Sequence, residues 1–147
     1  MKKIILTFSL IIIFVFSSFT TTIDPITKKV IGFVKKWWNV PYVYGGNSKR
    51  GIDCSSFTQR FYSEVFNTTI PRTASSQYKT ATKVNKKEIQ VGDLVFFSSK
   101  ISPSGWHVGV YIGDDQFIHA ANRKDDIKIS YLSDSNYKKS FKGAGRI

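Results

Sequence analysis

One cysteine and two histidines are the residues of this chain with the most distinctive chemistry. Cys54 is the only cysteine in the 147 residues, and His107 and His119 are the only histidines. A cysteine nucleophile needs a nearby imidazole to take the thiol proton and later protonate the leaving amine, and a third group to orient that imidazole. These residues are therefore the minimum set for nucleophilic catalysis. The alternative is a buried structural thiol and two histidines that serve only as hydrogen-bonded strand residues.

The position of Cys54 favours a reactive thiol. It follows Asp53, a residue type suited to cap a helix, and it begins an apolar pattern that predicts a helix over residues 54–66. Unpaired N–H groups and the helix dipole at such an amino end favour a thiolate and lower the pKa of the thiol. A zinc site of Cys54, His107 and His119 is open on ligand type. The spacings of 53 and then 12 residues match no compact zinc pattern, so we expect no metal and no cofactor.

The turn between two predicted strands decides whether the histidines can meet. A two-residue turn, 114–115, places His107 and His119 on opposite faces of the strand pair. A three-residue turn, 113–115, makes them diagonal neighbours on one face, with Cα atoms about 7 to 8 Å apart. Joint action of the two imidazoles therefore predicts an odd-length turn or a β-bulge at this point.

The first 22 residues have the order of a secretory signal peptide. Two lysines at 2–3 precede an apolar run over 4–16, and small polar residues follow at 17–22. The run is shorter than the about 20 residues of a membrane-spanning helix. We expect export to the cell envelope, with an uncleaved amino-terminal anchor as the alternative. No cysteine follows the apolar run, so we expect no lipid anchor.

The charge and length of the chain narrow its partners. The formal charge of +12 falls to +10 when the two lysines of residues 1–22 are removed. In an exported protein such a charge disfavours nucleic acid as a partner and makes anionic envelope polymers a candidate. The remaining residues, 23–147, suit one domain, and we expect a monomer.

Helices precede strands along the rest of the chain. The patterns predict helices over 25–38 and 54–66, a short helical segment after Pro71, a polar loop over 81–92, and strands over 94–97, 107–112 and 116–121. This order predicts an α+β domain with the helices packed on a small antiparallel sheet.

Several motifs in order resemble the NlpC/P60 family. They are YVYGG at 42–46, GIDCSSF at 51–57, VGDLVFF at 91–97, HVGVYIG at 107–113 and FIHA at 117–120. The resemblance covers residues from about 25 to 147, and within the family the chain looks most like the murein DD-endopeptidase lipoproteins of enteric bacteria. It implies a papain-like α+β fold.

The resemblance also implies roles for the matching residues. They are Cys54 as nucleophile, His107 as general base and acid, His119 as the residue that orients His107, Tyr42 as an oxyanion donor, and Asp53 and Ser55 as lining of the substrate cleft. Helix capping alone is an equal explanation for Asp53. Family members commonly carry glycine where this chain has Ser56, and we expect the packing to shift slightly there while the chemistry survives.

The implied activity is that of a cysteine endopeptidase acting on peptidoglycan stem peptides or cross-links. Two other functions stay open. One is a wall-binding module without activity, and the other is an amidase or acyltransferase on a papain-like fold.

Overall fold

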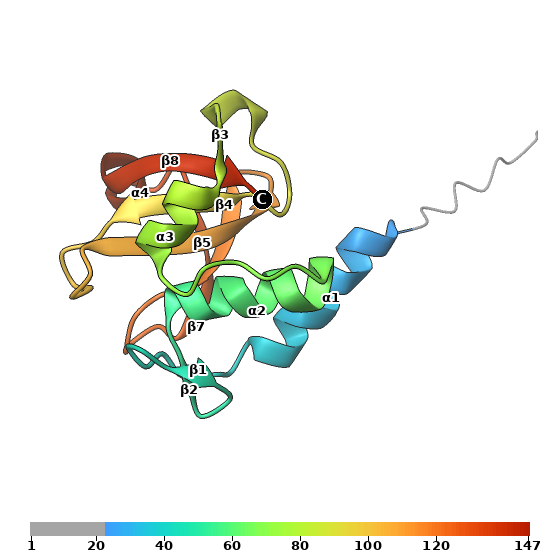
Figure 1. The fold of residues 1–147 in the computed structure, drawn as a ribbon, viewed down its shortest axis with the longest axis horizontal. Helices are drawn as coiled ribbons and strands as arrows, with labels where there is room; N and C mark the ends of the chain where they lie inside the picture. Colours follow the sequence, from blue (N-terminus) through green and yellow to red (C-terminus); the bar gives the residue numbers. More distant parts are fainter. Residues whose placement is uncertain (1–22) are drawn as a thin grey trace, which may run out of the picture.

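The computed structural model describes residues 23–147 (Figure 1). The predicted signal peptide, 1–22, lies outside these residues. In chain order the elements are α1 (Pro25–Trp37), β1 (Asn47–Ser48), β2 (Gly51–Ile52), α2 (Cys54–Phe66), α3 (Ala74–Thr80), β3 (Thr82–Val84), the 3-10 helix η1 (Lys86–Glu88), β4 (Leu94–Ser98), β5 (Trp106–Gly113), β6 (Gln116–Ala120), β7 (Ile127–Tyr131), α4 (Ser135–Ser140) and β8 (Phe141–Arg146). None of the helices in this part of the chain is long and apolar enough to cross a membrane.

A six-stranded antiparallel sheet forms the centre of the fold. Its strand order is β3-β8-β4-β5-β6-β7, and the small β1–β2 ribbon lies apart from it. α1 and α2 lie side by side, and α2 packs on β5 and β6 (Figure 1). The α+β class and the antiparallel sheet expected from the sequence are confirmed.

The two long helices begin and end where their sequences predict. The Asp24 carboxylate accepts hydrogen bonds from the N–H groups of Ile26 and Thr27 at the start of α1. The Asp53 carboxylate accepts one from Ser56 N–H at the start of α2, which ends at Asn67 in a left-handed conformation. Helix α2 therefore begins at Cys54, and the site depends on that placement.

Each face of the sheet has its own apolar core. The face toward α1 and α2 buries Phe57, Phe61, Leu94, Phe96, Val108 and Ile118. The other face buries Val95, Phe97, Phe117, Leu132 and Ala144, and Tyr137 of α4 packs against them. Burial on both faces explains why β4 is a continuous apolar run rather than an alternating one.

The carboxy-terminal part differs most from the sequence-based expectation. The segment 81–92, expected to be a polar loop, contains β3 and η1, because β3 pairs with β8 at the sheet edge. β7, α4 and β8 were not predicted. β7 and β8 form through pairing with β6 and β4, while the polar helix α4 packs on the sheet through Tyr137.

Candidate active site

His107 and His119 meet on one face of the sheet. A β-bulge between Tyr111 and Gly113 shifts the β5–β6 register, so that Val110 pairs with Ile118. His107 Nε2 and His119 Nδ1 lie 2.7 Å apart in a hydrogen bond. The bulge expected for joint action of the two imidazoles is confirmed.

Gly109 allows this close approach of β6. A Cβ atom at position 109 would lie 2.6 Å from a ring carbon of Phe117 and 3.2 Å from the Cβ of His119. Any side chain at 109 would therefore push the two histidine-bearing strands apart.

The hydrogen bonds continue beyond His119. Its Nε2 lies 3.0 Å from the Ser130 hydroxyl and 3.4 Å from the Tyr137 hydroxyl. If His107 Nδ1 is to accept a thiol proton, Nε2 of His107 must carry a hydrogen and donate it to His119 Nδ1. His119 Nε2 then carries its own hydrogen and donates to Ser130 or Tyr137. The far end of this chain therefore sets the tautomer of His107.

Cys54 lies at the amino end of α2 beside the start of β5. The backbone N–H of Val108, one residue from His107, contacts the Cys54 sulfur and favours its thiolate. Burial raises the pKa of the thiol to about 12 and outweighs this contact and that of Ser55 N–H. Burial likewise lowers the pKa of His107 to about 4 and that of His119 well below its usual value.

Burial thus favours the neutral form of the Cys54 thiol and of the His107 imidazole. The helix terminus leads us to expect a lowered thiol pKa, but in the closed site desolvation is the larger effect. A neutral imidazole is the protonation state that a general base requires.

Tyr42 lies in a stretch that β2 holds in place. Its backbone forms a parallel bridge with Ile52, and its N–H donates to Asp126 Oδ1 at 2.9 Å. Partial burial, followed by the nearby charges of Cys54 and Asp53, raises the pKa of the Tyr42 phenol to about 12. The hydroxyl therefore stays a hydrogen-bond donor at neutral pH.

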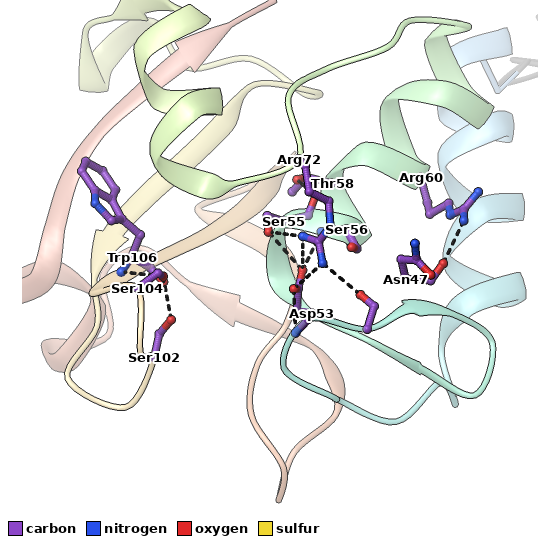
Figure 2. A network of polar contacts seen from close by, with 12 residues as sticks. Asn47, Asp53, Ser55, Ser56, Thr58, Arg60, Arg72, Ser102, Ser104 and Trp106 are labelled. Atoms are coloured by element: carbon purple, nitrogen blue, oxygen red, sulfur yellow. Dashed lines mark hydrogen bonds and ion pairs between the residues drawn. The ribbon is translucent and has the colours of Figure 1, made fainter.

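Asp53 does more than cap α2. Its carboxylate pairs with Arg72 through contacts of 2.7 and 3.0 Å, and it accepts hydrogen bonds from Gly45 N–H and the Ser55 hydroxyl (Figure 2). Burial raises the pKa of Asp53, but the hydrogen bonds from Arg72 and from Ser56 N–H outweigh it and lower the pKa. Asp53 is therefore an ionised, fully engaged anion that joins the helix start to the loop before α3.

A small cavity of about 140 Å³ opens at the thiol. Four residues expected in the site line it, namely Tyr42, Asp53, Cys54 and Ser55, together with Tyr44 and Arg72 among others. His107 is buried beside Phe97 and does not line the cavity. The folding of the chain thus brings four predicted site residues to one opening, while His107 and His119 are buried next to each other away from it.

Comparison with known proteins decides the family. Residues 39–146 match the sequence profile of the NlpC/P60 family. The chain belongs to the NlpC/P60 family. The resemblance seen in the motifs is thereby confirmed.

The most similar relatives are named as endopeptidases. A "Probable endopeptidase" of Haemophilus influenzae is 39% identical over 112 residues, which span 76% of this chain and 69% of that protein. The "Murein DD-endopeptidase MepS/Murein LD-carboxypeptidase" of Escherichia coli K12 is 34% identical over 90% of this chain and 68% of that protein. A solved NlpC/P60 family protein from Bacillus cereus is 33% identical with a TM-score of 0.73, over 84% of this chain and 41% of that one. The similarity covers the NlpC/P60 domain rather than the whole of these relatives.

Sequence reasoning missed three residues of this NlpC/P60 site. Ser130 and Tyr137 complete the hydrogen-bond chain, and Arg72 neutralises Asp53. Ser130 pairs with Phe117 across β6 and β7, so it shares a face with His119, but only the register of β7 reveals this. Within residues 23–147, no group of three or more His, Cys, Asp or Glu side chains is arranged to hold a metal ion.

Proposed function

We propose that this NlpC/P60 domain is a cysteine endopeptidase that hydrolyses peptide bonds in peptidoglycan stem peptides or cross-links. One observation carries the proposal: the 2.7 Å hydrogen bond between His107 and His119, which leaves Nδ1 of His107 for the thiol at the start of α2. The murein endopeptidase names of the similar proteins support the substrate class.

The first half of the proposed reaction forms a thioester. Nδ1 of His107 takes the proton of the Cys54 thiol as the sulfur attacks the peptide carbonyl carbon. The Cys54 backbone N–H, which has no carbonyl partner inside α2, and the Tyr42 hydroxyl stabilise the oxyanion. The imidazolium then gives its proton to the leaving amine nitrogen, and the C–N bond breaks.

The second half releases the acid product. His107 takes a proton from water as the water oxygen attacks the thioester carbonyl. The C–S bond breaks, the proton returns to sulfur, and the neutral thiol–imidazole pair is restored. His119 remains the group that orients His107 throughout.

Digestion of purified sacculi tests the proposal. The protein and its Cys54→Ala variant are incubated with sacculi, and the released muropeptides are identified by mass spectrometry. New peptide ends with the wild type alone are the expected result, and their masses identify the bond that is cut. Identical profiles refute the enzyme. Retention on sacculi without cleavage would indicate a wall-binding module, and altered sugar–peptide or acyl linkages would indicate an amidase or acyltransferase.

We also propose that residues 1–22 direct export and leave a mature domain over 23–147. The apolar run and the basic start of the sequence support this. Intact-mass measurement of the protein recovered from the envelope tests it. A mature amino terminus near residue 23 is expected, whereas a full-length mass would indicate a retained anchor.

A further inference from the structure

A second, larger cavity adjoins the one at the thiol. Its volume is about 550 Å³, and it shares Tyr42 and Tyr44 with the smaller cavity. The loop 122–124 forms one wall, and Ile101 and Pro103 form an apolar wall. Tyr42 and Tyr44 therefore form a wall common to both cavities.

The charges on this cavity are of one sign. Arg123 and Lys124 are its charged lining residues, and no acidic side chain lines it. Their side chains make no hydrogen bond or ion pair with any group in the described part of the chain. The acids of the same loop are already engaged: Asp125 pairs with Lys128 at 3.1 Å, and Asp126 accepts the N–H of Tyr42. Two unpaired cations therefore face the cavity.

The loop that carries these cations is held in place. Asn122 Oδ1 accepts Lys124 N–H at 2.8 Å, and the N–H of Asp126 donates to the carbonyl of Asn122 at 2.9 Å. Asp126 takes a left-handed conformation, with φ of 50°, and its carboxylate joins the loop to the backbone of Tyr42. The cations are thus positioned relative to Tyr42 by hydrogen bonds and not only by proximity.

Arg123 lines the same cavity as Tyr42. Burial is the largest cause of the raised pKa of Tyr42, and the charge of Arg123 acts against it. An anion bound by Arg123 would therefore occupy a cavity that Tyr42, proposed as an oxyanion donor, also lines.

We propose that Arg123 and Lys124 bind a carboxylate of the substrate peptide. The proposal rests on the proposed function, since it names the part of a peptidoglycan peptide that this cavity takes. The guanidinium fork of an arginine matches a planar carboxylate, and the Ile101 and Pro103 wall suits the aliphatic chain that carries it. The cavity accordingly selects peptides with a free carboxylate beside the bond that is cut over their amidated counterparts.

Two synthetic probes test the selection. One is a cross-linked dimer of stem peptides with its carboxylates free, and the other is the same dimer with those carboxylates amidated. Binding is measured by calorimetry in the Cys54→Ala background, so that neither probe is consumed. We expect the free acid to bind about tenfold more tightly, the combined effect of two partly exposed charge-assisted contacts.

Matched variants assign the preference to this cavity. Arg123→Gln/Lys124→Gln should remove the tenfold difference, and Arg123→Lys/Lys124→Arg should restore most of it. Lys28→Gln/Lys139→Gln, which removes the same charge from exposed positions on α1 and α4, should leave it unchanged. All these side chains are exposed, so their thermal unfolding should match that of the parent.

The outcomes separate this proposal from the proposed function. Equal binding of the two probes, or a difference that survives Arg123→Gln/Lys124→Gln, refutes the carboxylate site. A loss of the difference with Lys28→Gln/Lys139→Gln also refutes it, because net charge would then suffice. If the preference holds but the wild type leaves both probes and sacculi uncut, the endopeptidase is refuted and the binding site stands.

Discussion

Removing the hydroxyl groups beyond His119 should slow catalysis although neither touches the substrate. In the tautomer proposed for catalysis, Ser130 and Tyr137 accept the Nε2 hydrogen of His119, at 3.0 and 3.4 Å. That hydrogen must stay on Nε2 if His119 Nδ1 is to accept from His107 and leave Nδ1 of His107 free for the thiol proton. Three variants, Ser130→Ala, Tyr137→Phe and the double variant, test whether these hydroxyls control the tautomer of His107 through His119.

The size of the effect follows from what each variant leaves unpaired. In Ser130→Ala the Tyr137 hydroxyl still accepts, so about 1 kcal/mol is lost, which is about fivefold in kcat. In the double variant the Nε2 hydrogen of the fully buried His119 has neither hydroxyl to bond. A buried unsatisfied donor costs about 2 kcal/mol, or about 30-fold in kcat. The second substitution should therefore cost more after the first than it does alone.

Two measurements are needed to assign the loss to the tautomer. The rate is followed with a cross-linked muropeptide at saturating concentration, and the imidazole nitrogen shifts of His107 are followed by NMR. The fraction of His107 with hydrogen on Nε2 should fall in the same order as kcat. Ser135→Ala, an exposed change at the start of α4, is the matched control and should alter neither.

Two results would refute the reasoning. One is a double variant in which the tautomer of His107 changes while kcat is kept. The other is a lower kcat with an unchanged tautomer, since Ser130 and Tyr137 would then act by another route.

Three further predictions concern burial and positioning. The pKa of His107 is about 4 in the fold against 6.5 when unfolded, so its stabilising contribution is complete above pH 6.5 and is lost as the pH falls toward 4. Between pH 7 and pH 4 the loss is about 3 kcal/mol, so urea unfolding over this range should show a shallower decline in His107→Gln, an equal decline being the contrary result. Ser56 Oγ is, among residues 23–147, the one buried side-chain polar atom without a hydrogen-bond partner. Ser56→Ala should therefore raise the free energy of unfolding, measured in urea, by about 1 kcal/mol. A lower free energy of unfolding in this variant would show that Ser56 Oγ does have a partner. Asp126→Ala frees the backbone of Tyr42 and should lower kcat about threefold. Asp126→Asn keeps the side-chain oxygen that accepts the Tyr42 N–H and should retain the rate. Equal losses of kcat in both variants would point to the negative charge of Asp126 instead.

Local signals in the sequence were enough to place Cys54. A capping aspartate directly before an apolar helical pattern determines where α2 begins, and the structure starts that helix at Cys54. Placing the two histidines on one face needed one more step. Strand alternation showed that the length of the turn between β5 and β6 decides whether they share a face. Both inferences depend on residues near each other in the sequence or on one hairpin.

Long-range partners could not be predicted in that way. Arg72 reaches Asp53 from 19 residues away, and Asp126 reaches the N–H of Tyr42 from 84 residues away. Arginine and aspartate are common surface residues, and nothing in their immediate neighbours distinguishes a paired one. Ser130 needed the β6–β7 register, because the alternation of Ile127, Ile129 and Tyr131 in β7 would turn Ser130 toward solvent, whereas its pairing with Phe117 buries it.

The groups proposed for proton transfer are also groups of the core. Cys54 belongs to the apolar cluster between α2 and the sheet, and His107 and His119 are buried on the opposite face beside Phe97 and Phe117. The same desolvation keeps thiol and imidazole neutral at rest and makes a protonated imidazole costly to the fold. Protonation of His107 therefore removes the general base and weakens the packing in one step, so acid should abolish activity and stability over the same pH range. At the half-buried Tyr42, activity and stability are not coupled in this way. Changes at its hydroxyl should lower the rate while the free energy of unfolding is kept.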